Sequence, residues 1–444
     1  MAAFIGARDL PTPGRTWPAL SEHRWLRFAA FTLFYLCQGF PIGLTSLAFP
    51  AWLTGQGFSP AEVAGFVATV TMPWGLKLIA GPFMDRFAFP AMGLRRPWVI
   101  GAQSLMILTG LSLVLLHDAR AQLVWLTALC TLLNTWAAMQ DVAVDGMAVT
   151  VLRDDERGRA NAFMVAGQVA GYSATGWLSV KLLNTYGIPA AGLLTAGAVG
   201  CVGAIALLAR ERPGERLLPW SAGHAHPDAP VPERNTRRLL VDTVRLLLLP
   251  MSLVLVGVEA SYRILEGICM VWHPEVAITQ FGYSDEAYSQ WTSTTSAVAA
   301  GVGLLMGPVI DRIGARRGIF VGLLCNAALY VVLRFSIPAL AHPAFAIGML
   351  AGTQLGSQWM FISTVSLFMN VCGVRIAATQ FAIYMALSNL ARSGGARLYP
   401  EFRAWLGPES IYVVMIVGYL LGVAILAFFN LKRHRDTLAR LGEA

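Results

Sequence analysis

The sequence predicts an all-α integral membrane protein with twelve transmembrane helices, arranged as two pseudo-symmetric six-helix halves. Three observations lead to this prediction: an apolar composition, hydrophobic runs of membrane-spanning length, and a motif that occurs once in each half. Of the 444 residues, 56% are hydrophobic and only 13% are charged, and the mean hydropathy is +0.58. Since a soluble chain of this length carries far more charge on its surface, a membrane protein is favoured.

The hydrophobic runs are about 20 residues long, which is the length at which an α-helix crosses roughly 30 Å of hydrocarbon. We predict twelve of them, beginning near Trp25, Pro60, Pro97, Gln122, Arg157, Ile188, Leu246, Glu286, Gly318, Pro343, Ile376 and Ile411. The first run is too long for a signal peptide and is expected to remain as a helix. The six cysteines lie in apolar runs without close pairing, so we expect neither a disulfide framework nor a metal site.

A six-residue motif ends one run as Gly81-Pro82-Phe83-Met84-Asp85-Arg86 and another as Gly307-Pro308-Val309-Ile310-Asp311-Arg312. Each copy is followed by a glycine and then by a pair of arginines. The glycine is Gly93 in the first copy and Gly314 in the second. A polar motif repeated at half the chain length indicates two homologous membrane halves, a pattern typical of secondary transporters.

The basic residues are distributed unevenly along the chain. With both termini in the cytoplasm, cytoplasmic segments hold 25 of the 33 Lys and Arg residues and outside segments hold 5. This asymmetry predicts cytoplasmic N and C termini and an even number of helices. The net charge of +8 therefore reflects membrane topology, and we expect no nucleic-acid partner.

A segment rich in Pro, Gly, His and charge interrupts the hydrophobic pattern and divides the chain. The predicted parts are a cytoplasmic tail (1–24), an N-terminal six-helix half (25–210), a cytoplasmic linker (211–245), a C-terminal six-helix half (246–431) and a second tail (432–444). A short amphipathic helix is expected near Arg237. Gly167 and Gly171 form a small-xxx-small pair in the fifth span, and Gly394 with Gly395 interrupts the eleventh. For both pairs we expect packing, in which helix backbones approach closely and the helices can rock.

The repeated motif resembles the signature loop between the second and third helices of the major facilitator superfamily. That loop has a glycine, apolar residues, Asp-Arg, another glycine and basic residues. The resemblance implies that Asp85, Arg86, Asp311 and Arg312 act at a cytoplasmic gate and do not touch the substrate. A carboxylate at a helix N-terminus gains about 0.3–1 kcal/mol, enough to bias a balanced equilibrium between two states.

Four further stretches resemble the AmpG-type muropeptide permeases: residues 38–44 (QGFPIGL), 73–77 (PWGLK), 140–145 (QDVAVD) and 378–382 (ATQFA). The resemblance implies proton-driven import of anhydromuropeptides, which are cell-wall fragments, through the bacterial cytoplasmic (inner) membrane. The wider family includes carriers of coenzyme A conjugates and siderophores, so these anionic solutes remain alternatives.

Ionisable residues inside the spans are functional candidates, because each is costly there unless it is paired or faces a watery cavity. Asp141 and Asp145 share one helix face, and mutual repulsion at low dielectric favours proton binding. For Asp145 the alternative is pairing with Arg153, Arg157 or Lys77. Glu259 is a further proton-binding candidate, in a Glu259–Arg263–Glu266 ladder that has the alternative of neutralising itself.

Cations within the spans are candidates for binding an anionic substrate, since arginine binds carboxylates and phosphates in bidentate fashion. They are Lys77, Arg263 and Arg392, with snorkelling or a buried ion pair as the alternative for Lys77. Gln38, Gln140 and Gln380 are candidates for hydrogen bonds to a sugar or peptide, and helix bridging is the alternative for each.

Two alternatives to a transporter are an intramembrane enzyme and a sensor that does not transport its ligand. The chain has no His-Glu-x-x-His zinc motif, nucleophile elbow or GxxxxGK[ST] phosphate loop. We therefore expect a transporter driven by a proton gradient, with no cofactor or metal, working as a monomer in the lipid bilayer.

Overall fold

The computed structural model describes residues 18–87, 89–152, 156–227, 245, 247–371 and 377–440. Apart from one isolated bridge between Ala19 and Arg210, the regular structure of the described residues is helical. The N-terminal half contains α1 (Arg24–Gly43), η1 (Leu44–Ala48), α2 (Phe49–Gly55), α3 (Pro60–Thr71), α4 (Pro73–Arg86), η2 (Pro90–Met92), α5 (Arg96–Ser112), η3 (Leu113–Leu115), α6 (Leu123–Val151), α7 (Arg157–Tyr186) and α8 (Ile188–Leu208).

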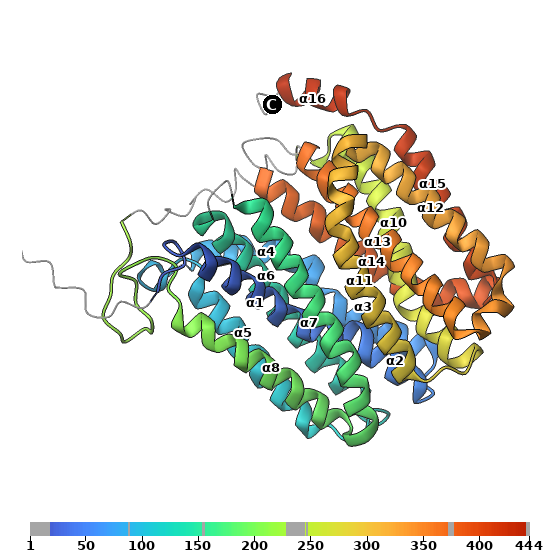
Figure 1. Ribbon diagram of the computed structural model, residues 1–444, viewed down its shortest axis with the longest axis horizontal. Helices are drawn as coiled ribbons and strands as arrows, with labels where there is room; N and C mark the ends of the chain where they lie inside the picture. Colours follow the sequence, from blue (N-terminus) through green and yellow to red (C-terminus); the bar gives the residue numbers. More distant parts are fainter. Residues whose placement is uncertain are drawn as a thin grey trace, which may run out of the picture.

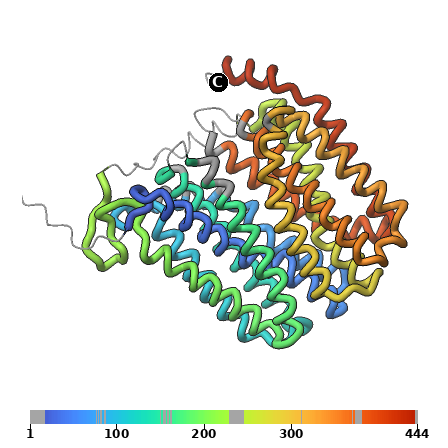
Figure 2. The backbone as a smooth tube through the Cα atoms, viewed as in Figure 1, coloured from blue at the N-terminus to red at the C-terminus, as the bar shows by residue number. Residues whose placement is uncertain are grey.

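The C-terminal half lies beside the N-terminal half, as the yellow-to-red and blue-to-green segments show in Figures 1 and 2. It contains α10 (Pro250–Glu275), η4 (Val276–Gln280), α11 (Asp285–Ile313), α12 (Ala315–Phe335), η5 (Ile337–Ala341), α13 (Pro343–Val371), α14 (Ala377–Leu406) and α15 (Ser410–Ala427), followed by α16 (Leu431–Arg440). The expected helix near Arg237 lies outside the described residues. The same holds for residues 1–17 and 441–444 of the two tails and for residues 228–244 of the linker.

These helices confirm the predicted twelve spans. The first span is α1 with η1 and α2, the second is α3 with α4, and the seventh is α10 with η4. Each span begins within four residues of its predicted start. In the described chain, seven helices are long and apolar enough by themselves to cross a membrane, and the others carry more polar or charged positions. The chain is a multi-pass membrane protein.

The two halves share helix caps and glycines with positive φ at corresponding places. Ser59 caps α3 in a capping box with Glu62, and Ser284 caps α11 by accepting from the Ala287 N–H at 3.1 Å. Gly93 and Gly314, the glycines that follow the two motif copies, have φ of +97° and +86°. Only glycine takes this conformation without strain, which explains its presence after both copies.

The first span of each half contains a π-helical segment: η1 interrupts the first span, and η4 ends the seventh. Prolines lie beside both segments, at Pro41 and Pro50 in one half and at Pro274 in the other. A proline removes a backbone hydrogen bond from a helix and favours such local rearrangement.

Glycines bring one pair of helices into backbone contact in each half. In the N-terminal half α1 meets α7, where a Cβ added at Gly171 would lie 2.2 Å from the Leu36 carbonyl oxygen. In the C-terminal half α10 meets α14, where a Cβ at Gly267 would lie 1.9 Å from the Arg392 carbonyl oxygen and one at Gly395 2.0 Å from that of Ile264. The close approach expected at the Gly394–Gly395 pair is found at Gly395, and α14 continues through both residues without a break.

The linker, the start of α1 and α16 lie at one end of the helix bundle, which we call the linker end (Figure 1). The Leu20 N–H donates to the Arg210 carbonyl at 2.8 Å, which joins the chain before α1 to the start of the linker. The opposite end, where α2 ends and α11 begins, is the far end.

Hydrogen bonds join the two halves at the far end and in the middle of the helices. At the far end, Ser289 Oγ donates to the Gly176 carbonyl at 2.6 Å, and Asn184 Nδ2 donates to both carboxylate oxygens of Asp285 at 3.1 Å. In the middle, the hydroxyls of Thr71 and Ser393 lie 2.8 Å apart. The halves are therefore in contact from the far end to the middle of the bundle.

Buried charges fix the linker end of the N-terminal half. The Glu211 carboxylate accepts from the backbone N–H groups of Leu94, Arg95 and Arg96, and so caps α5 from the linker. The Arg96 guanidinium, 2% exposed, donates to carbonyls of the last turn of α8 and of the linker. The first part of the linker is thus bound to the N-terminal half.

Candidate functional site

The centre of the N-terminal half is a line of polar contacts between α1 and α6, which run antiparallel. Asn134 Nδ2 donates to Thr45 Oγ1 at 2.9 Å, Gln38 Nε2 donates to Asp141 Oδ1 at 2.6 Å, and the Tyr35 hydroxyl donates to Asp145 Oδ1. In these three contacts, lower residue numbers on α1 pair with higher residue numbers on α6, and both directions lead to the linker end. Asp141 and Asp145 therefore share one face of α6, as predicted, and that face is turned toward α1.

Lys77 on α4 forms an ion pair with Asp141 on α6, with 2.7 Å between Nζ and Oδ2. The two side chains are 13% and 7% exposed. Gln168 Nε2 on α7 donates to Gln38 Oε1 at 2.9 Å and so orients the amide that binds Asp141. Four helices thus meet at one carboxylate, whose burial is compensated by one cation and one amide.

Asp145 lies one turn closer to the linker end than Asp141 and is exposed. Its described partner is the Tyr35 hydroxyl, a residue that the sequence analysis did not single out. Of the three basic partners considered for Asp145, Lys77 binds Asp141 instead, while Arg153 and the side chain of Arg157 lie outside the described parts. No signal in the sequence pointed to Tyr35, because its proximity depends on the register of α1 against α6.

The centre of the C-terminal half holds the Glu259–Arg263–Glu266 ladder on α10. Arg263 Nε lies 2.8 Å from Glu259 Oε1, and Nη1 lies 2.6 Å from Glu266 Oε2. The Arg263 guanidinium also lies over the rings of Tyr262 and Phe361, at 5.1 and 5.7 Å. The second oxygen of Glu259 is buried, has no hydrogen-bond partner among the described residues, and borders a small cavity beside Ser388.

Arg392 on α14 faces the same centre without a carboxylate in hydrogen-bonding contact among the described residues. Its Nη2 donates to Asn389 Oδ1 at 3.2 Å, and its buried Nε has no hydrogen-bond partner in that part of the chain. Asn389 in turn donates to the Trp74 carbonyl at 3.4 Å, one turn from Lys77. This contact connects the charged clusters of the two halves into one central site.

The charges of this site nearly balance. Lys77, Arg263 and Arg392 stand against the carboxylates of four acids, Asp141, Asp145, Glu259 and Glu266. When all are ionised, one negative charge is in excess, and binding of one proton removes it. An unbalanced charge is costly within the membrane.

The other predicted site residues have separate places. Gln140 Nε2 donates to the Phe34 carbonyl at 2.6 Å, and the fully buried Gln380 donates to the Tyr384 hydroxyl at 3.0 Å. The two motif copies lie at the linker ends of α4 and α11, where Arg312 is exposed. The side chains of Asp85, Arg86 and Asp311 lie outside the described parts, so their gate role remains a prediction.

Two buried carboxylates that form ion pairs away from the centre were missed by the sequence analysis. Glu275 at the far end of α10 accepts from the Tyr399 hydroxyl at 2.5 Å and from Arg403 Nε at 2.8 Å. Glu156 at the linker end pairs with Arg27 at 2.7 Å. Both acids are satisfied by neighbouring helices, and neither adds to the central charge. In the described chain, no group of three or more His, Cys, Asp and Glu residues is placed to hold a metal ion.

Comparison with known proteins gives three findings. The family model described as "Major Facilitator Superfamily" matches residues 31–396. The anhydromuropeptide permease of Escherichia coli strain K12 is 25% identical over 413 residues, which cover 90% of this chain and 79% of the permease. An uncharacterized protein of Haemophilus influenzae is 31% identical over 153 residues, 33% of this chain and 35% of that protein.

Among solved structures, the crystal structure of a D-xylose-proton symporter is similar in fold, with a TM-score of 0.71 at 13% identity. The match covers 91% of this chain and 97% of the symporter. At this identity the likeness shows the fold alone. The predicted arrangement of two six-helix halves and the resemblance to the AmpG-type permeases are thereby confirmed.

Proposed function

Since the chain belongs to the Major Facilitator Superfamily and is a transporter, not an enzyme, we propose that it imports an anionic cell-wall fragment, an anhydromuropeptide, by proton-driven symport. The substrate class is supported by the similarity to a permease named for anhydromuropeptide over 90% of the chain. Import occurs by alternating access of the central site to the two sides of the membrane.

The observation that carries the coupling proposal is the ion pair between Lys77 and Asp141, in a site with one excess negative charge. Lys77 belongs to α4 and Asp141 to α6, so the pair bridges two helices. Protonation of Asp141 removes the attraction and releases Lys77 into the centre, where its charge is free to meet an anion. Deprotonation re-forms the bridge and displaces that anion. Proton binding and substrate binding are thereby linked through one lysine.

Asp145 is the second proton-binding position in this proposal. It is exposed toward the linker end and lies one turn from Asp141, so it can pass a proton between Asp141 and that side. Tyr35, which donates to Asp145, orients the carboxylate. Glu259, whose second oxygen has no described partner, is the alternative proton-binding position in the other half, and the variant Glu259→Gln decides between the two halves.

Arg392 is the residue that we propose as the first anchor for the anion. Arg263 is occupied by two glutamates, whereas Arg392 is held only by the Asn389 amide among the described residues. A guanidinium of this kind binds a carboxylate in bidentate fashion. Gln38 and Gln380 remain candidates for contacts to the sugar or peptide part, and Lys77 joins them after protonation of Asp141.

We further propose that the linker end faces the cytoplasm and that the membrane is the bacterial inner membrane. The excess of Lys and Arg on that side of the predicted topology supports this orientation. In this orientation, the hydrogen bonds between the halves close the outer side of the central site. The exposed Asp145 then faces the cytoplasm. Asp85, Arg86, Asp311 and Arg312 then take part in the inner gate.

The test is uptake of a labelled anhydromuropeptide into right-side-out membrane vesicles, with and without a protonophore. We expect accumulation above the outside concentration that collapses when the protonophore is added. Lack of uptake by correctly inserted protein would contradict the substrate. The same vesicles would then be given a ferric siderophore and a coenzyme A conjugate, the two alternative anionic solutes.

A further inference from the structure

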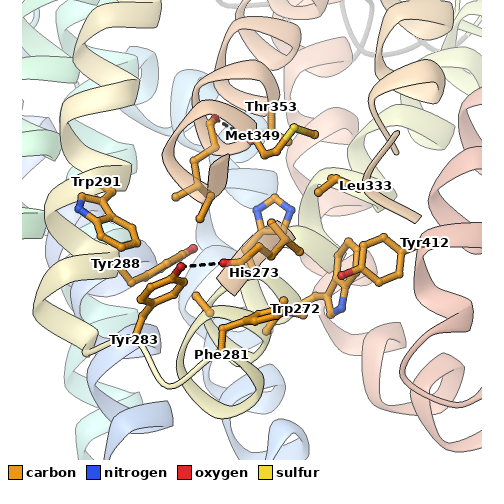
Figure 3. A pocket seen from close by; sticks show the side chains of 15 residues that line it. Trp272, His273, Phe281, Tyr283, Tyr288, Trp291, Leu333, Met349, Thr353 and Tyr412 are labelled. Carbon is orange, nitrogen blue, oxygen red and sulfur yellow. Dashed lines mark hydrogen bonds between the residues drawn. The ribbon is translucent and has the colours of Figure 1, made fainter. Parts of the chain in front are cut away.

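A second cavity lies in the C-terminal half, near the far end of the bundle. It is walled by α10, η4, α11, α12, η5, α13 and the first turn of α15 (Figure 3). Its volume is about 70 Å³, and its walls are largely aromatic, with Trp272, His273, Tyr283, Tyr288, Trp291 and Tyr412. The half-buried Phe281 and Tyr283 stand at its edge, where the chain passes from η4 to α11.

This aromatic pocket is separate from the charged centre. Trp272 follows Glu266 by six positions on α10, which is about 9 Å along the helix axis. Among the described residues that line the pocket, none is Asp, Glu, Lys or Arg. A charged solute would lose its hydration here without compensation, so the pocket selects uncharged ligands.

Two polar groups in the pocket wall are buried without a described hydrogen-bond partner. They are the Trp272 indole N–H and the Tyr412 hydroxyl, on side chains that are 2% and 3% exposed. The two rings meet edge to face with their centroids 4.7 Å apart. Buried groups of this kind are usually satisfied, and leaving one unpaired costs about 1–3 kcal/mol. An indole N–H only donates, so its missing partner is an acceptor.

We propose that this pocket binds an uncharged solute that carries one ring and a hydrogen-bond acceptor, such as a hydroxyl or carbonyl oxygen. The aromatic walls contact the ring edge to face or offset, and a shift of the Trp272 side chain brings its N–H, which has no accessible surface in this arrangement, to the acceptor. A cavity of about 70 Å³ holds only part of a ring, so the remainder extends to the edge formed by Phe281 and Tyr283.

The position of the pocket connects it to the contact between the halves. Ala277, Tyr288 and Leu350 line the pocket and also belong to a small apolar cluster with Leu47 and Ala51 of the N-terminal half. A ligand in the pocket therefore touches residues that hold the far end closed. Its binding stabilises the arrangement described here relative to one in which the far end is open.

The test uses 4-fluorobenzyl alcohol, an uncharged ring with a hydroxyl, and the full protein in nanodiscs. We measure the fluorine transverse relaxation rate of the probe as its concentration rises, and subtract the rate with empty nanodiscs. Saturable excess relaxation is expected for the wild type. Ala346→Phe fills the pocket from α13 and is expected to weaken binding at least tenfold. The matched control is Val321→Phe, at an exposed position of α12 away from the pocket-lining Leu333. This variant should bind as the wild type does.

A second variant tests the hydrogen bond and does not depend on the folding of the first. Trp272→Phe keeps an aromatic ring and removes the donor, so the dissociation constant of 4-fluorobenzyl alcohol should rise about fivefold. The same variant should bind 4-fluorotoluene, which lacks the acceptor, about as well as the wild type does. No saturable binding to the wild type would overturn the proposal, as would equal binding of the alcohol by wild type and both variants.

Discussion

The two halves of the molecule share helix order, caps, π segments and glycine contacts, yet they handle central charge differently. In the N-terminal half, Lys77 and Asp141 come from different helices, and Gln38 adds a third. In the C-terminal half, Arg263 lies between two glutamates of its own helix. A relative movement of α4 and α6 breaks the first pair, whereas no movement of α10 as a rigid body changes the second. This difference supports our proposal that coupling belongs to the N-terminal half and that Arg392 of the other half binds the anion.

The largest effect is expected for Asp141→Asn. Asparagine keeps the shape and the contact with Gln38 but binds no proton, so accumulation driven by the gradient should be abolished while some counterflow remains. Uptake and counterflow in the same vesicles measure this. Glu259→Gln is the matched change in the C-terminal half and should retain accumulation within about threefold, because Arg263 keeps Glu266. Equal loss of uptake and counterflow in Asp141→Asn would contradict the coupling role.

Removal of the cation from each cluster should separate the halves further. Lys77→Gln leaves Asp141 buried without its partner, and breaking a buried pair in this way costs about 3–5 kcal/mol. Thermal unfolding in detergent should show a clear loss of stability. The double variant with Asp141→Asn should recover most of it, since no unpaired charge remains. If the double variant were no more stable than Lys77→Gln, the pair would not be the interaction that was lost.

The anion anchor predicts a smaller and more specific change. Arg392→Gln should raise the KM for the substrate about tenfold to a hundredfold, from the loss of one charge-assisted contact worth about 1.5–3 kcal/mol. Dependence of uptake on the proton gradient should remain. Arg263→Gln at the paired position should instead lower the amount of folded protein, because two glutamates lose their partner. An unchanged KM in Arg392→Gln would remove it from the binding site.

The smallest effect concerns the linker, which binds only the N-terminal half in the described chain. Burial raises the pKa of Glu215 from 4.5 to about 7. The Arg212 N–H and the charges of Arg212 and Arg96 oppose this rise in pKa, and the Glu211 carboxylate adds to it. A carboxyl whose pKa is higher in the folded state favours folding most below pH 4.5, and this contribution falls as the pH rises through 7. The Tm of the wild type should therefore fall by about 1–2 °C more than that of Glu215→Gln between pH 6 and pH 8. Parallel curves for the two proteins would contradict this.

Features set by local sequence were predictable, and features set by helix register were not. The span starts and the ladder on α10 follow from hydrophobic run length and from positions three and four residues apart. The partner of Lys77 is Asp141 on another helix, and the sequence analysis considered Lys77 as a partner for Asp145. The contact of Tyr35 with Asp145 and the close approach at Gly267 also depend on how two helices pack. Of the Gly394–Gly395 pair, Gly395 makes the close contact, and which of the two does so depends on the same packing.

The most direct test of the coupling account is substrate-driven acidification of proteoliposomes that contain the purified protein and a pH-sensitive dye, with no gradient imposed. Addition of anhydromuropeptide outside should acidify the lumen for the wild type and for Glu259→Gln. Asp141→Asn should exchange the solute without acidification. Acidification by Asp141→Asn at the wild-type rate, or loss of acidification in Glu259→Gln alone, would contradict the assignment of proton coupling to the N-terminal half.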